Sequence, residues 1–132
     1  MRVVRAAAAL LVASALACAG ARPFPPPPQG TDDAAAREVL GRFVRALDAG
    51  RFDEAHALLS DRWRAASSPT RLAADFRGAG PTAREAAARV ASRLAAGEPL
   101  SRSPEGVRLP VGGGRSALLV AQGGAWRVDA LE

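Results

Sequence analysis

The sequence predicts an α+β domain in which three to four helices pack on a small C-terminal antiparallel sheet of three to four strands. Two observations support this order. Between residues 31 and 97, apolar side chains recur every three or four positions, which is the period of an amphipathic helix. From residue 98 onward they alternate, and glycine-containing turns separate the alternating runs. Helices followed by strands indicate one α+β domain over residues 31–132.

The first residues predict an export signal. Arg2 and Arg5 form a basic beginning, and the uncharged run 6–17 that follows is too short to span a bilayer comfortably. We therefore expect residues 1–17 to be a signal peptide.

The uncharged run ends Ala15-Leu16-Ala17-Cys18, which resembles a bacterial lipobox, the motif in which a cysteine receives a diacylglyceryl group before cleavage on its amino side. A favoured lipobox has a bulky residue in place of Ala15, and ordinary cleavage after Ala17 is the alternative. Cys18 is the only cysteine, so without lipid an exported chain would carry an unpaired thiol. By the same resemblance, Ala19 indicates the periplasmic face of the outer membrane. We expect a membrane anchor at Cys18.

Residues 18–30 are predicted to be a tether. They include Pro25–Pro28, and consecutive prolines fix φ and remove backbone donors. Such a segment is extended polyproline II and would hold the domain away from the membrane.

The first helix is predicted to begin at the capping residues Thr31-Asp32-Asp33 and to end at Gly50, where a left-handed conformation is easiest for glycine. Its apolar stripe consists of Ala36, Val39, Leu40, Phe43, Val44 and Leu47.

Three further helices are predicted from their start and stop signals. The second helix is predicted to start at Asp53, and the third to run from Ser68-Pro69 to Gly78. The fourth is predicted to run from Thr82 to Gly97, with Glu85 completing a capping box. The side chains expected to face the core are Ala55, Leu58, Leu59, Trp63, Leu72, Phe76, Ala83, Ala87, Val90 and Leu94.

The strands are predicted from alternation and from the turns between them. They are 107–111, 115–121 and 126–128, with a less regular fourth around Leu100. The turn signals are 104–106, 112–114 and 122–124.

Three segments carry a resemblance to a known family: Phe43–Ser60, Arg64–Phe76 and Gly123–Asp129. Together they resemble small bacterial lipoproteins of the nuclear-transport-factor-2-like superfamily (cystatin-like, SnoaL-like α+β domains). In these proteins a helical hairpin rests in a curved sheet whose last strand ends Gly-x-Trp-x-Val. The fourth helix and the low strand count depart from the pattern, which predicts a shallow pocket or none.

The segment 47–59 also resembles one tetratricopeptide helix pair, which would imply a helical peptide-binding adaptor. A solenoid requires repeats of about 34 residues, and the chain contains no second copy. The strand-like C-terminal part does not belong to a solenoid either.

The net charge of +5 does not by itself predict nucleic-acid binding. All 18 basic residues are Arg, and Ile, Asn, Lys and Tyr are all absent, which fits a codon bias toward GC-rich triplets. Basic residues form no run interleaved with aromatics. We expect no nucleic-acid partner.

Few residues suggest chemistry. His56 is the only histidine, so no metal-ligand set is expected, and Gly112–Gly114 is followed by no helix or Lys that would make a phosphate loop. Enzymes of the superfamily use a buried carboxylate with a Tyr or second acid, and Tyr is absent. The remaining carboxylates considered, Asp48, Asp53, Asp61 and Asp75, have surface or capping explanations.

The sequence thus predicts a non-catalytic binding or accessory module without metal or cofactor, acting on an unknown protein or small apolar ligand. A cofactor-free isomerase or hydrolase of the same fold is the alternative. The residues expected to form either an apolar pocket or the core itself are Phe43, Leu47, Trp63, Phe76, Leu119 and Trp126.

Overall fold

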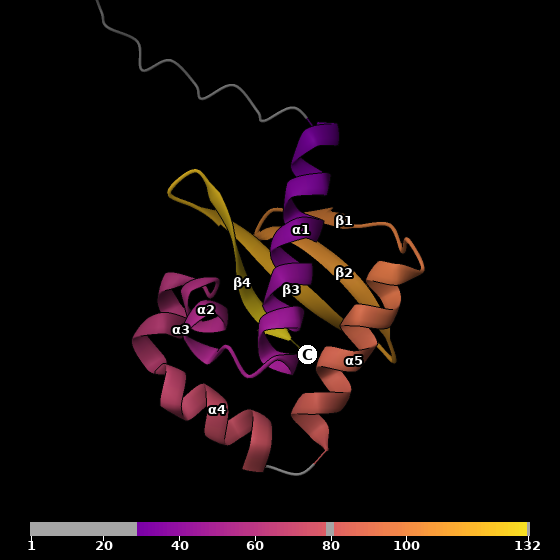
Figure 1. Cartoon of the computed structure of the whole chain (residues 1–132). Helices are drawn as coiled ribbons and strands as arrows, with labels where there is room; N and C mark the ends of the chain where they lie inside the picture. The colour runs from indigo at the N-terminus through magenta and orange to yellow at the C-terminus, as the bar shows by residue number, and fades with distance from the viewer. Residues whose placement is uncertain (1–28, 79–80, 132) are drawn as a thin grey trace, which may run out of the picture.

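A computed structural model describes residues 29–78 and 81–131. The predicted signal peptide, Cys18 and nearly all of the tether lie outside the described residues. Within them, five helices precede a four-stranded antiparallel sheet, which confirms the α+β class with more helices than expected (Figure 1). None of the described helices combines the length and hydropathy that a membrane span requires.

Helix α1 (Gln29–Asp48) begins before the residues that were expected to cap it, so that prediction is wrong. Its end is as predicted, because Gly50 has a positive φ of 72° and terminates the turn. The stripe faces the core along most of its length. Its buried members are Ala36, Leu40, Phe43, Val44 and Leu47.

The single second helix expected from the sequence is two helices, α2 (Phe52–Ala57) and α3 (Asp61–Ala66). Arg51 is at the N-cap position of α2, so Asp53 lies inside the helix and does not cap it. Between α2 and α3, Leu59 forms an isolated parallel bridge with Val128 of the last strand, and Ser60 is extended. Backbone pairing to the sheet therefore interrupts the helix.

Helices α4 (Pro69–Gly78) and α5 (Thr82–Ala95) were both expected. The Ser68 hydroxyl accepts a hydrogen bond from the Arg71 amide at 3.1 Å, which confirms Ser68 as a cap. The capping box at the start of α5 is wrong, because Pro81 is at the N-cap position and no side chain caps the first turn.

The sheet is a meander with strand order β1-β2-β3-β4, as predicted. Two of its hairpins turn through paired glycines with positive φ, at 113–114 and 123–124, the signature of type I′ turns. The strands are β1 (Ser101–Ser103), β2 (Gly106–Gly112), β3 (Arg115–Gln122) and β4 (Ala125–Leu131).

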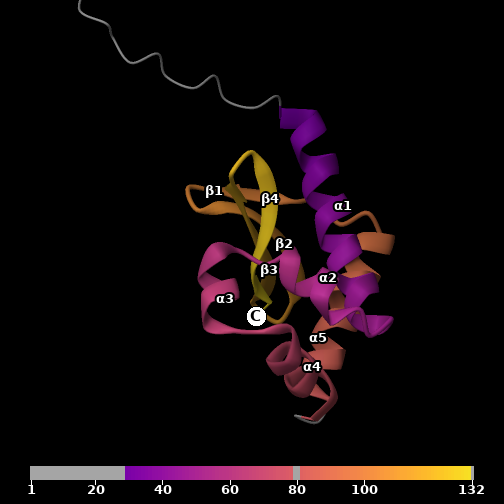
Figure 2. The same cartoon turned by 60° about the vertical axis from the view of Figure 1, so that its left-hand side comes forward.

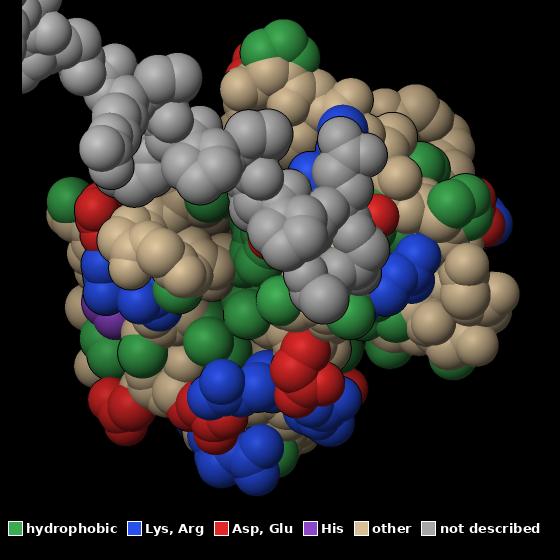
Figure 3. Space-filling model, turned by 90° about the horizontal axis from the view of Figure 1, so that it is seen from above, with side chains coloured by type: hydrophobic (Ala, Val, Ile, Leu, Met, Phe, Trp, Pro, Cys, Tyr) green, Lys and Arg blue, Asp and Glu red, His purple; other side chains and the backbone are tan. Residues whose placement is uncertain are grey.

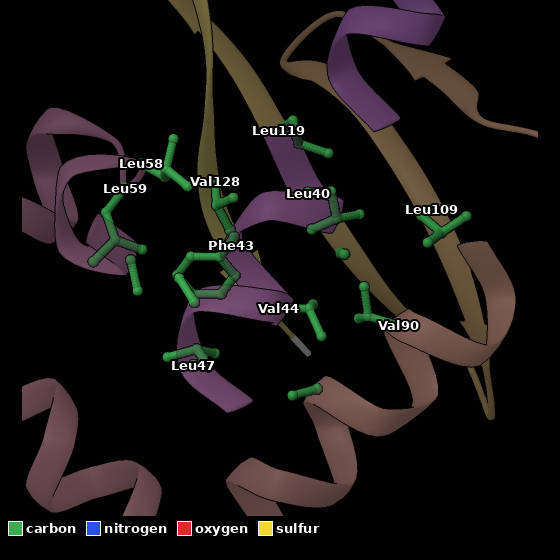
Figure 4. Close-up of a cluster of buried hydrophobic side chains, with 14 of the residues drawn as sticks. Leu40, Phe43, Val44, Leu47, Leu58, Leu59, Val90, Leu109, Leu119 and Val128 are labelled. Carbon is green, nitrogen blue, oxygen red and sulfur yellow. The ribbon is translucent and has the colours of Figure 1, made fainter. Parts of the chain in front are cut away.

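The core lies between one face of the sheet and the helices. Helices α1 and α5 cross this face, and α2 and α3 lie beside β4 (Figures 1 and 2). In Figure 4, Phe43 of α1 points toward Leu59 and Val128, while Leu40 lies between the helices and the sheet. The predicted inward residues of β2 are all buried, namely Val107, Leu109 and Val111.

Candidate ligand-binding cleft

An apolar cleft opens where the second half of α1 meets α3, α4, α5 and the end of β4. In Figure 1 these elements surround the C-terminus in the lower half of the molecule. The cleft has a volume of about 340 Å³, near the small end of the range of roughly 300–1,000 Å³ for ligand pockets. Its polar side chains are Asp75, Thr82 and Asp129. The apolar lining consists of Phe43, Leu47, Leu59, Trp63, Leu72, Phe76, Ala83, Ala86, Val128, Ala130 and Leu131.

Four of the six residues expected to form a pocket or core line this cleft. Phe43 and Leu47 project from α1 and are buried (Figure 4). Trp63 comes from α3, and the half-buried Phe76 comes from α4. Folding thus brings three separate helices together around one apolar space.

The other two residues lie elsewhere. Leu119 on β3 has no exposed surface and belongs to the core. Trp126 on β4 is half-buried, and its indole nitrogen donates a hydrogen bond to Oδ1 of Asp32 at 2.7 Å. Because Asp32 lies near the start of α1, Trp126 fastens β4 at the end of α1 that is remote from the cleft.

The expectation that Trp63 faces the core is wrong. Its side chain is 41% exposed, the largest exposed apolar side chain among the described residues. The reason is the interruption between α2 and α3, which restarts the helical path at Ser60 and changes the face on which Trp63 lies. Trp63 therefore lies at the edge of the cleft.

Asp129 brings an ionised group to the cleft wall. Its Oδ2 lies 2.8 Å from Nη2 of Arg62, and its Oδ1 accepts a 2.6 Å hydrogen bond from the hydroxyl of the fully buried Ser60. The hydrogen bond from Arg62 lowers the pKa of Asp129. Partial burial opposes this shift, whereas the Ser60 hydrogen bond and the positive charge of Arg62 reinforce it. Asp129 is therefore a stable carboxylate whose oxygens already have donors.

Sequence reasoning missed this Ser60–Arg62–Asp129 group. Simple alternation along β4 predicts that the side chains of Asp129 and Val128 point to opposite faces of the sheet. The register with β3 shifts at this point, however, and Asp129 is the extra residue of a β-bulge. A signal for Ser60 was present, because a Ser followed by an acidic residue is typical of a helix start. The Ser60 side chain does accept a hydrogen bond from the Trp63 amide.

The remaining polar residues of the cleft have local explanations. Asp75 accepts a 3.0 Å ion-pair contact from Nε of Arg71 one turn earlier on α4. Thr82 is the first residue of α5, whose first turn no side chain caps. Neither residue is placed as a reactive group.

A second, more polar hollow adjoins the cleft. It has a volume of about 500 Å³ and shares the side chains of Leu47 and Phe76 with the cleft. Its charged residues are Asp48, Arg77 and Arg84. The apolar cleft therefore lies directly beside a hollow that contains two arginines.

The other sequence candidates have structural roles. The Nε2 atom of His56 lies 3.1 Å from the carbonyl oxygen of Ser67, which links α2 to the segment after α3. Within the described residues, no group of three or more His, Cys, Asp or Glu side chains is placed to hold a metal ion. Gly112–Gly114 closes the hairpin between β2 and β3, as predicted.

Charges of both signs are mixed on the surface. Most of the described arginines form ion pairs with nearby carboxylates, for example Arg51 with Glu54 at 2.9 Å and Arg108 with Glu105 at 2.7 Å. The face seen in Figure 3 shows basic and acidic side chains next to one another. Positive charge on this face is therefore locally balanced.

No family model, curated protein or solved structure matches the chain.

Proposed function

We propose that this protein is an exported lipoprotein, anchored in the bacterial envelope through Cys18, whose domain binds a small apolar ligand without catalysing a reaction. The observation that carries the proposal is the cleft of about 340 Å³ with mainly apolar walls. Concave apolar sites with a few placed polar groups are the usual form of small-molecule sites.

The position of the cleft suits a protein held at its N-terminal end. Leu47, in the cleft, and Gln29, where α1 begins, lie at opposite ends of the helix. At 1.5 Å per residue this separation is about 27 Å. A chain attached through residues that precede α1 would present the cleft away from its anchor. The lipid anchor and the outer-membrane location themselves rest on the Ala15–Cys18 motif and on Ala19.

A binding role is favoured over the alternative of a cofactor-free isomerase or hydrolase. A general base works best when its pKa lies near the working pH. The pKa of Asp129 is instead lowered, and its oxygens are occupied by Arg62 and Ser60. Asp75, the other carboxylate of the cleft, is paired with Arg71. Both carboxylates are therefore better suited to lining the edge of the cleft than to accepting a proton as a general base.

The peptide-binding adaptor is also disfavoured. A tetratricopeptide pair needs two helices of comparable length, whereas α2 has 6 residues against 20 in α1. An α+β domain with helices against a meander is in keeping with the proposed relation to the nuclear-transport-factor-2-like lipoproteins, which rests on the sequence segments that resemble them.

The test uses an uncharged apolar probe and a variant that fills the cleft. Ala86 lines the cleft on α5, and Ala88 lies exposed on the same helix outside it. We expect the full chain to bind Nile red with an increase in its fluorescence. Ala86→Trp should abolish most of that increase, because the larger side chain occupies the space.

Ala88→Trp is the matched control and should bind the probe like the unmodified chain. Thermal melting of both variants separates loss of the cleft from loss of the fold. The proposed function would be contradicted if the unmodified chain did not bind the probe. It would also be contradicted if the folded Ala86→Trp and Ala88→Trp variants bound the probe equally.

A further inference from the structure

The cleft and the hollow beside it share part of their walls but differ in polarity. Leu47 of α1 and Phe76 of α4 line both spaces, so they form the boundary between them. On the cleft side the walls are mainly apolar, and on the hollow side polar and apolar surface are about equal. A molecule that filled both would need an apolar body and a polar end.

The hollow contains basic groups without acidic partners. Among the described arginines, those whose side chains form neither an ion pair nor a hydrogen bond with a described residue are Arg77, Arg84 and Arg115. Arg77 and Arg84 lie in the same hollow. In a domain where most arginines are paired with carboxylates, this leaves two guanidinium groups with free donors on one concave surface.

Local packing holds one of these groups over the hollow. The guanidinium carbon of Arg77 lies 4.8 Å from the centroid of the Phe52 ring, a cation–π arrangement. A Cβ atom at Gly50 would lie 3.4 Å from Nη2 of Arg77, so glycine leaves room for the guanidinium there. Stacking on Phe52 occupies one face of the group and leaves its N–H edge able to donate.

The balance of charge favours an anion at this end. Asp48 is the only carboxylate that lines the hollow, against the two arginines. The carboxylates of the neighbouring cleft, Asp75 and Asp129, are neutralised by Arg71 and Arg62. The cleft and the hollow taken together therefore carry an excess of positive charge, which lies in the hollow beside Phe76.

We propose that the ligand is an amphipathic organic anion, with its apolar body in the cleft and its anionic group at Arg77 and Arg84. This inference rests on the proposed binding function and adds the chemical class of the ligand. The two arginines select the anionic end, while Leu47 and Phe76 contact the apolar part next to it.

The experiment compares three probes that share one alkyl chain: decanoate, decan-1-ol and decyltrimethylammonium. Binding to the full chain is measured by calorimetry at a pH well above the carboxyl pKa of decanoate. The concentrations stay below the micelle concentrations of the two ions and below the solubility limit of decan-1-ol. We expect decanoate to bind about tenfold more tightly than decan-1-ol, because two exposed ion pairs each contribute modestly. Added salt should reduce this preference, since exposed charges are screened.

The variants Arg84→Gln and Arg77→Gln/Arg84→Gln test the site of the anion. Each should lower the affinity for decanoate, the double variant by about tenfold, and leave that for decan-1-ol unchanged. Arg115→Gln is the matched control, because Arg115 also lacks an oxygen acceptor and lies on β3 outside both spaces. The Arg84 side chain forms no hydrogen bond, ion pair or ring contact with a described residue, so its replacement leaves the packing intact even where Arg77→Gln disturbs Phe52.

The outcomes separate this inference from the proposed function. Equal binding of decanoate and decan-1-ol, preference for the cation, or an equal effect of Arg84→Gln and Arg115→Gln would overturn the inference and leave an apolar binding site. Binding of neither decanoate nor decan-1-ol would overturn the binding function as well.

Discussion

The hydroxyl of Ser60 donates a 2.6 Å hydrogen bond to Oδ1 of Asp129, and 69 positions separate these residues in the sequence. Two backbone hydrogen bonds flank this contact, from the Ser60 amide to the Val128 carbonyl at 2.8 Å and from the Val128 amide to the Leu58 carbonyl at 2.9 Å. The interruption between α2 and α3 is thereby fixed to the last strand. The same contact holds Asp129 in the wall of the cleft.

Replacing Ser60 with Ala should lower the free energy of unfolding by about 1–3 kcal/mol, because a partly buried hydrogen bond to a charged group is lost together with the cap of α3. Urea unfolding measures the change. Ser92→Ala, on the exposed side of α5, is the control and should have little effect. If the two variants are equally stable, the Ser60 contact does not stabilise the fold.

The stability of the protein should depend on the ionisation of Asp129. Its pKa in the folded state is lowered from 3.8, so the ionised form favours folding. Its contribution is therefore fully present above the unfolded value and is lost as the pH falls through the lowered folded pKa. Asp129→Asn should remove this dependence, so the stability difference from the unmodified chain shrinks toward low pH.

Urea unfolding at a series of pH values measures that difference. Asp53→Asn is the control, because Asp53 is exposed and forms no ion pair with a described residue. A difference between the Asp129→Asn variant and the unmodified chain that stays constant with pH would contradict the expected role of Asp129.

Gly106, in the hairpin between β1 and β2, should not tolerate a side chain. A Cβ atom there would lie 2.0 Å from the carbonyl oxygen of Leu119. We expect Gly106→Ala to destabilise the protein by about 1–3 kcal/mol or more, since the sheet backbone has to move. Gly78→Ala is the control, because nothing lies within 4 Å of a Cβ there. Thermal unfolding of the two variants should differ clearly, and similar melting temperatures would contradict this steric account.

Cys18→Ser tests the proposed anchor, since the oxygen of serine cannot replace the thiol that receives the lipid. The variant should move from the membrane fraction to the soluble periplasmic fraction, and labelled palmitate should be incorporated only by the unmodified chain. The lipoprotein proposal fails if the unmodified chain takes up no palmitate. Cleavage without lipid would then support the alternative of plain secretion.

Much of the fold follows from local patterns. The stripe from Ala36 to Leu47 and the alternation of Val107, Leu109 and Val111 each indicate one buried face, because helix and strand periods differ. Paired glycines mark the hairpins, since type I′ turns require positive φ at both central residues. These features depend on residues close together in the sequence, so the sequence is sufficient to predict them.

The candidate site was predictable only in part. Phe43, Leu47, Trp63 and Phe76 could be named from the sequence as apolar residues of a pocket or core, but not which of these they would form. The pairing of Ser60 with Asp129 was not predictable, because a β-bulge reverses the direction expected from alternation. A bulge depends on the partner strand and leaves no local period.

The sequence by itself therefore determined the α+β class, the meander and most of the core, because burial patterns and turn conformations are set within a few residues. Tertiary structure alone decided where the helix breaks at Leu59, why Trp63 lies at the edge of a cleft, and how Arg77 and Arg84 come to share one hollow. Those outcomes depend on which distant segments compete for the same hydrogen bonds and the same space.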